Sequence, residues 1–250
     1  MKAPEQRFAK SLPEFMDVTA GIIVSWSSST MGEARPWYRG QMRAEWNLVP
    51  SEFRYENLSA DELRTDFALK ARALLPSTPV NDWEWYFLMQ HYGLPTRLLD
   101  WTMGSLIALH FALCHETGSH DASVWVIDPW ALNKWSLGDP DLMLTTDNKA
   151  VAYLPATFSN KLVPRKPIAV VPPYNSARIT VQRGVFTVHG SDIKGIDQLY
   201  FKRLIQIVIP KDFTFLIRRQ LRSSGISEFT LFPDLDGLCR DIHAFYIEGC

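Results

Sequence analysis

The stretch Leu88-Met-Gln-His-Tyr-Gly-Leu-Pro-Thr-Arg-Leu-Leu-Asp-Trp101 places many polar side chains in an apolar neighbourhood. Four aromatic residues precede it, Trp83, Trp85, Tyr86 and Phe87, and an apolar run from Leu106 to Leu113 follows it. Buried polar and charged groups cost several kcal/mol unless they are paired. These groups therefore either satisfy one another in a structural network or line a pocket for a ligand. They are Gln90, His91, Tyr92, Thr96, Arg97 and Asp100.

Cap and turn residues divide this region into a helix, an extended segment and a second helix. Asn81 or Asp82 is expected to begin the first helix, which ends at Gly93 because glycine suits the position after a helix. Residues 94–101 are expected to be extended or irregular, and residues 102–114 to form a buried helix.

The rest of the chain alternates between helical and extended patterns. Helices, several with cap residues such as Ser11 and Ser59, are predicted over 11–26, 60–75, 130–135, 211–224 and 233–241. A strand is predicted at 37–38, followed by an Arg39-Gly-Gln41 turn. Further strands are predicted at 122–128, 168–171, 178–182, 185–189, 204–209 and 229–232, with a hairpin or two bent strands around Arg183-Gly184. Helices come early and strands late, so we expect one α+β domain: a helical N-terminal half packed on a mostly antiparallel, bent or split β-sheet.

Composition excludes some classes of function. The formal net charge of −1 over 250 residues gives no general attraction to nucleic acid or anionic membrane. Cys114, Cys239 and Cys250 show no paired or metal-binding spacing, which favours a reducing compartment. The sequence begins with no signal peptide and has no apolar run of about 20 residues. We therefore expect a cytoplasmic protein with no membrane association.

Motifs for common enzyme chemistries are missing: no GxGxxG follows a strand, and there is no GxxxxGK[ST], GxSxG or HExxH. Asp234 and Asp236, near Glu228, suggest either a metal-binding carboxylate set or the acidic start of a helix, which the helix dipole favours. The capping role is preferred, and His110 is expected to be a surface or tolerated histidine.

Arg39 follows two aromatic residues and precedes Gly40. An arginine in this position either binds a phosphate or carboxylate through two parallel hydrogen bonds from its guanidinium, a bidentate contact, or pairs with Asp100. Gly40 favours the phosphate interpretation because it permits a ligand to approach the backbone. Arg97 and Asp100 form a buried ion pair if their role is structural. We expect Arg39, Gln90, His91, Arg97 and Asp100 to converge on one concave site.

The motifs Tyr38-Arg-Gly-Gln41 and Leu88–Thr102 together resemble the FRG domain. Tyr38 replaces the phenylalanine of its Phe-Arg-Gly motif, and Trp46, Pro50-Ser51 and Arg54 match nearby positions. Later matches are Gln182-x-Gly-x-Phe186 and Leu231-Phe-Pro-Asp-Leu-Asp-Gly237. The resemblance implies a single FRG domain over 1–250, with a motif-bearing core of about 15–245. It also implies a bacterial or phage origin and a role as an effector in conflict between phage and host.

A more distant resemblance, to ADP-ribosyltransferases of the arginine–serine–glutamate type, implies chemistry and an ADP-ribosyltransferase-like fold. Tyr38-Arg-Gly40 resembles the strand that holds the NAD phosphates, and Thr96–Trp101 with Ala108–Ala112 resembles the following strand and helix. Glu228 matches the late catalytic glutamate, although no Ser-Thr-Ser or Glu-x-Glu motif is present. The catalytic residues implied are Glu228, His91 and Arg39. The NAD-binding residues implied are Arg39, Gly40, Gln41, Gln90, Tyr92, Thr96, Arg97, Asp100 and Gln182.

Two other classes of function stay open. One is a metal-dependent nuclease using His91, Asp100, Asp234 or Asp236. The other is a non-catalytic module whose aromatic cleft recognises a nucleotide or a partner protein. The transferase and the binding-module hypotheses both predict a nucleotide or dinucleotide ligand. The transferase also needs a macromolecular acceptor, which the sequence does not identify.

Overall fold

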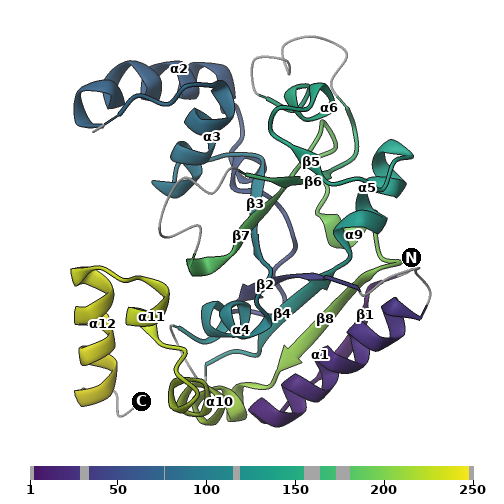
Figure 1. The fold of residues 1–250 in the computed structure, drawn as a ribbon, viewed down its shortest axis with the longest axis vertical. Coiled ribbons are helices and arrows are strands. Elements are labelled where there is room, and N and C mark those ends of the chain that lie inside the picture. The colour runs from purple at the N-terminus through teal and green to yellow at the C-terminus, as the bar shows by residue number, and fades with distance from the viewer. Residues whose placement is uncertain are drawn as a thin grey trace.

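The computed structural model describes residues 3–28, 34–75, 77–114, 119–154, 164–172 and 181–247 (Figure 1). Its strands are β1 (Glu5–Phe8), β2 (Trp37–Gln41), β3 (Leu98–Thr102), β4 (Ala122–Ile127), β5 (Met143–Leu144), β6 (Ile168–Val171), β7 (Gly184–Val188) and β8 (Leu204–Ile209). Its helices are α1 (Leu12–Ser27), η1 (Ser51–Arg54), α2 (Ala60–Ala71), η2 (Arg72–Leu74), α3 (Asp82–His91), α4 (Ser105–Leu113), α5 (Pro129–Leu137), α6 (Asn148–Val151), α9 (Ile196–Leu199), α10 (Lys211–Ser223), α11 (Glu228–Leu231) and α12 (Leu235–Tyr246).

The strands form one mixed sheet in the order β1-β8-β4-β2-β3-β7-β6-β5. The pairings at its two edges, β1 with β8 and β5 with β6, are parallel, and the pairings between them are antiparallel. The fold is therefore α+β, as expected. The expected helical N-terminal half is wrong, because β1, β2 and β3 all lie before residue 103 and alternate with helices.

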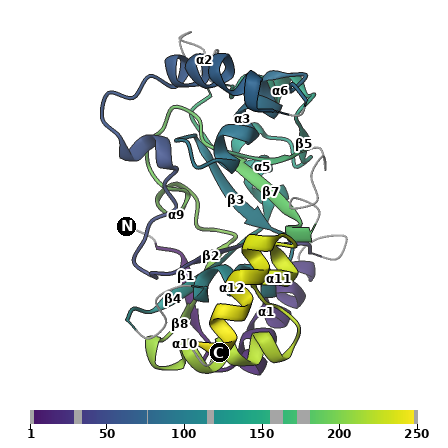
Figure 2. The same cartoon turned by 90° about the vertical axis from the view of Figure 1, so that its left-hand side faces the viewer.

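The sheet is nearly divided between β2 and β3. These strands share the single residue pair Tyr38↔Thr102, whereas β2 pairs with β4 along its whole length and β3 does the same with β7. Figure 2 shows the result, with β3 and β7 in the upper part of the molecule and β4 and β8 in the lower part. The two halves of the sheet therefore diverge from one point, beside Tyr38 and Thr102.

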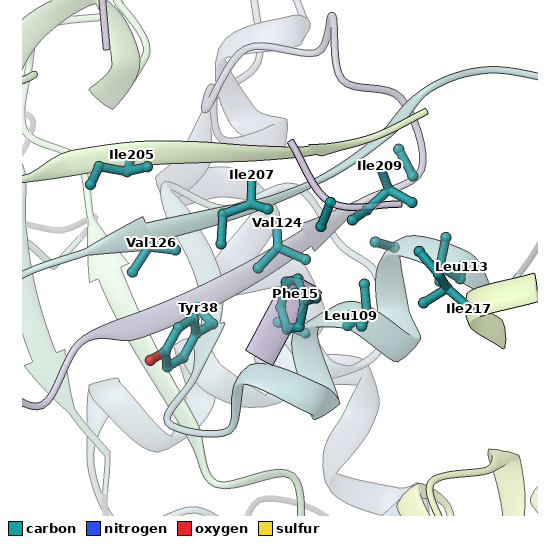
Figure 3. Close-up of a cluster of buried hydrophobic side chains, with 14 of the residues drawn as sticks. Phe15, Tyr38, Leu109, Leu113, Val124, Val126, Ile205, Ile207, Ile209 and Ile217 are labelled. Atoms are coloured by element: carbon teal, nitrogen blue, oxygen red, sulfur yellow. The ribbon is translucent and has the colours of Figure 1, made fainter. Parts of the chain in front are cut away.

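Three hydrophobic clusters hold the layers together. The first packs α1, α4 and α10 against β2, β4 and β8, with Phe15, Tyr38, Leu109 and Ile207 among its members (Figure 3). The second packs α3 against β3, β6 and β7. The third includes side chains from both halves, among them Trp37 of β2 and Trp101 of β3. Along β3, Leu98 belongs to the second cluster and Leu99 and Trp101 to the third, so Asp100 lies on the same side of the strand as Leu98.

Local signals placed several helix ends correctly. The side chains of Ser11, Ser59 and Asn81 accept hydrogen bonds from the backbone three residues on, which confirms their predicted capping roles. Gly93 has φ +78° and Gly225 has φ +84°, so both glycines occupy the left-handed position that ends a helix.

Other boundaries were wrong. Residues 228–231 form helix α11 and no strand, because Ser227 and Thr230 make reciprocal side-chain to backbone bonds that begin a helical turn. Thr102 ends β3, and α4 begins only at Ser105. The last helix continues to Tyr246. Of the predicted strand 178–182, residues 178–180 lie outside the described part, and the remaining two are helical. In the described residues, no helix has the length and apolar character needed to cross a membrane.

Candidate functional site

A cavity of about 380 Å³ opens where β2 and β3 diverge, between the first and second hydrophobic clusters. A volume of this size lies within the range of small-molecule sites. Its aromatic lining is Tyr38, Phe87, Trp101, Phe111 and Phe186, and its polar side chains are Arg39, Gln90, His91, Asp100, Thr102 and Gln182. The cavity thus combines an apolar wall with a few converging polar groups, the usual composition of a ligand site.

Arg39 reaches across the divided sheet. Its Nη1 donates a hydrogen bond to the backbone oxygen of Asp100 at 2.6 Å and lies 3.7 Å from Asp100 Oδ2. The side chain is only 19% exposed, and its buried Nε has no hydrogen-bond partner among the described residues. Burial lowers the pKa of Arg39, Asp100 opposes this effect, and the positive charge of Arg54 adds to it. Arg39 is therefore a cation with an unused donor at the cavity wall.

Asp100 is held in place by a short chain of side chains. Gln90 Nε2 donates to Asp100 Oδ2 at 2.7 Å, and Thr96 Oγ1 donates to Gln90 Oε1. Thr96 is fully buried and also accepts from the backbone N–H of Leu98 at 3.1 Å. The Asp100 side chain itself is 58% exposed. A buried hydroxyl thus fixes the orientation of a carboxylate that faces the cavity.

The structural alternative, an ion pair between Arg97 and Asp100, does not hold. Arg97 Nε pairs instead with Glu52, which lies on η1 and is 6% exposed. Tyr86 joins them, since its hydroxyl donates to Glu52 Oε2 at 3.3 Å and accepts from Arg97 N at 2.7 Å. Burial raises the pKa of Glu52, and Arg97 opposes that rise. The polar residues of the 88–101 stretch therefore divide into an inner structural network and an outer pocket wall, connected by Thr96 and Gln90.

The structure distributes the predicted site residues unevenly. Arg39, Gly40, Gln90, His91, Asp100 and Gln182 line the cavity. Thr96 and Arg97 belong to the structural network behind it. Gln41 is buried elsewhere, accepting from Trp125 Nε1 at 2.8 Å, and Tyr92 is 65% exposed outside the lining. The role of Glu52 as the partner of Arg97 was not predicted, because no local pattern distinguishes it from a surface glutamate.

Gly40 has a packing role that the sequence did not indicate. A Cβ at this position would lie 2.0 Å from the Ala108 oxygen and 2.6 Å from the Ala112 nitrogen of α4. Gly40 is therefore required for the close packing of α4 on β2, whatever it contributes to a ligand.

Glu228 lies outside the lining of this cavity. It lines an adjoining cavity of about 450 Å³, and Phe111 lines both. Its Oε1 is 3.0 Å from His110 Nε2, and its Oε2 accepts from Arg240 Nε at 3.0 Å. The hydrogen bond to His110 is the main cause that lowers the pKa of Glu228 to about 2, so the group is ionised at neutral pH. His110, expected to be a surface or tolerated histidine, is buried and positions this glutamate.

The acidic residues near Glu228 lie at the start of helix α12. Asp234 Oδ1 accepts from Gly237 N at 2.7 Å and caps α12, which confirms the preferred interpretation. Within the described ranges, no group of three or more histidine, cysteine, aspartate or glutamate residues is arranged to hold a metal ion.

Residues 34–121 match the family model of the FRG domain. The matched segment contains β2, α3, β3 and α4, which supply most of the cavity lining, so this part of the chain is an FRG domain. Gln182 and residues 231–237, which also resemble the family, lie outside the match. No curated protein and no solved structure matches the chain.

Proposed function

We propose that the cavity between β2 and β3 binds NAD or a closely related nucleotide and that the protein uses it in ADP-ribosyltransferase-like chemistry. The observation that carries the proposal is Arg39, a largely buried arginine that lines an aromatic cavity and whose buried Nε has no hydrogen-bond partner among the described residues. A buried charged donor without a partner is costly, and an anionic ligand removes that cost.

The charge around Arg39 favours an anion. Arg54 lies close enough to lower the pKa of Arg39, and the opposing carboxylate of Asp100 is more than half exposed to solvent. An exposed carboxylate is screened by water and compensates a buried cation poorly. A phosphate group that takes two hydrogen bonds from a guanidinium suits this environment.

The aromatic wall suits a nucleotide base or nicotinamide ring. Trp83, Phe87 and Phe186 form a stacked series, with ring centroids 5.4 Å apart for the first pair and 4.7 Å for the second. Phe87 and Phe186 line the cavity, so they give it a rigid apolar surface. Flat ligands gain favourable stacking on such surfaces.

When bound, NAD supplies an ADP-ribosyl group whose bond to nicotinamide breaks on transfer. A carboxylate beside the positive charge that develops at the ribose stabilises it by several kcal/mol in a dry site. Glu228 is the proposed carboxylate because it is ionised, is only 11% exposed and lines a second cavity that shares Phe111 with the proposed NAD-binding cavity.

A second candidate is a nucleotide-binding module without catalysis. It is favoured by Glu228, both of whose oxygens are engaged by His110 and Arg240. The two candidates make different predictions for nicotinamide release. The test is to incubate the wild type and Glu228→Gln with NAD and to measure the nicotinamide released. The surface variant Glu45→Gln is the control. The transferase proposal predicts release that falls by two to three orders of magnitude in Glu228→Gln only. NAD binding without any release would support the module, and absence of both would refute both candidates.

A further inference from the structure

Asp100 is more firmly oriented than its pairing with Arg39 requires. The two groups are 3.7 Å apart, and the carboxylate is largely exposed, so their attraction contributes little to stability. Yet Gln90 and the buried Thr96 fix one oxygen, Oδ2, through successive hydrogen bonds. Such support is typical of a side chain whose orientation matters to a ligand.

The other oxygen of this carboxylate is available to a ligand. Within the described part of the chain, Asp100 Oδ1 has no hydrogen-bond partner, and the residue lines the same cavity as Arg39. An ionised carboxylate only accepts hydrogen bonds, so its partner must be a donor. A ligand that contacts Asp100 therefore has to present a donor close to the group that binds Arg39.

We propose that Asp100 accepts a hydrogen bond from a ribose hydroxyl of the bound nucleotide and makes the site selective for ribonucleotides over their 2′-deoxy counterparts. This inference rests on the proposed nucleotide binding. A ribose carries hydroxyl donors next to its phosphate, and acidic side chains are well suited to accept from them. Gln90 and Thr96 are positioning residues that act through Asp100.

The test is calorimetric titration with NAD and with the two analogues that lack the 2′-hydroxyl on one ribose or the other. The wild type should bind one analogue at least about tenfold more weakly than NAD, the loss expected for one charge-assisted hydrogen bond. Asp100→Asn should weaken NAD binding by a similar factor and leave the affinity for that analogue unchanged. Asp17→Asn, on the exposed face of α1, is the matched control and should behave as wild type.

The positioning role has its own readout. Thr96→Val removes the hydroxyl that holds Gln90 and should reduce discrimination between NAD and the deoxy analogue, whereas Thr96→Ser should retain it. Equal binding of NAD and both analogues by the wild type would overturn this inference alone. So would an equal loss for all three ligands in Asp100→Asn. Failure of the wild type to bind NAD would overturn the proposed function and this inference together.

Discussion

Arg39 on β2 donates a hydrogen bond to the backbone oxygen of Asp100 on β3, 2.6 Å away, across strands that share only one residue pair. The guanidinium thus occupies part of the space where ladder hydrogen bonds would continue in an undivided sheet. One side chain connects the two halves of the sheet and also lines the cavity between them. The proposed ligand would therefore contact the same side chain that connects the two halves of the sheet.

Substitution of Glu52 or Arg97 alone should strongly destabilise the protein. Glu52→Gln or Arg97→Met leaves the other charge buried without its partner, which costs about 3–5 kcal/mol. The double variant should lose less than the sum of the single losses, because it strands no charge. Urea denaturation of the four proteins measures this, and additive losses would show that the two groups do not interact.

Asp100→Asn should barely change stability. The carboxylate is 58% exposed and 3.7 Å from Arg39, so its removal costs about 0–1 kcal/mol. This contrasts with the large loss expected if Asp100 were the buried partner of Arg97. A fall in unfolding free energy as large as that of Arg97→Met would contradict the observed division between network and pocket.

Gly40→Ala should disrupt the packing of α4 on β2. The new Cβ would meet the backbone of α4 at 2.0 Å, and a backbone atom cannot move aside as a flexible side chain can. We expect a loss of about 2 kcal/mol or more in unfolding free energy. Gly21→Ala in α1 is the control, since the nearest atom lies 3.9 Å from its added Cβ. That change should be neutral or stabilise by up to about 1 kcal/mol.

His189 should make the protein less stable in acid. It is fully buried, and burial lowers its pKa from 6.5 to about 3, although the negative charge of Asp192 opposes this effect. The unfolded chain therefore binds a proton between pH 6.5 and 3 that the folded chain does not. The contribution to stability is complete above pH 6.5 and falls by about 1.4 kcal/mol per pH unit below it.

The variant His189→Leu isolates this effect. Between pH 7.5 and about 5, its unfolding free energy should fall by about 2 kcal/mol less than that of the wild type. Urea denaturation at several pH values gives the two slopes. Parallel slopes for the two proteins would show that His189 is not the group responsible.

Local sequence signals predicted the elements that local chemistry determines. Ser11, Ser59, Asn81 and Gly93 define helix ends through contacts within a few residues, and these were found correctly. β1 escaped prediction because Glu5–Phe8 is polar and becomes a strand only by pairing with β8, about 200 residues later. The short run 229–232 was assigned wrongly, since three apolar residues and a threonine fit a short strand and a helical turn equally well.

In the candidate site, too, local features could be predicted from the sequence and contacts between distant residues could not. The sequence indicated that polar groups near Gly93 face a ligand or one another, and both alternatives occur in neighbouring residues. The partner of Arg97 could not be predicted, because Glu52 lies 45 residues away and becomes close only when η1 packs beside α3 and β3. The aromatic wall depends on β7, whose Phe186 reaches Phe87 through the pairing of β7 with β3.

Calorimetric titration of NAD into the wild type, Arg39→Lys and the surface variant Arg72→Lys tests the central claim most directly. Lysine keeps the charge of Arg39 but loses the two-pronged donor geometry, so affinity should fall at least about tenfold, equivalent to 1.4 kcal/mol. Arg72→Lys, on the exposed helix η2, should bind as the wild type does, and thermal melting should show that all three proteins are folded. Equal NAD affinity in wild type and Arg39→Lys, or no binding by the folded wild type, would contradict the account.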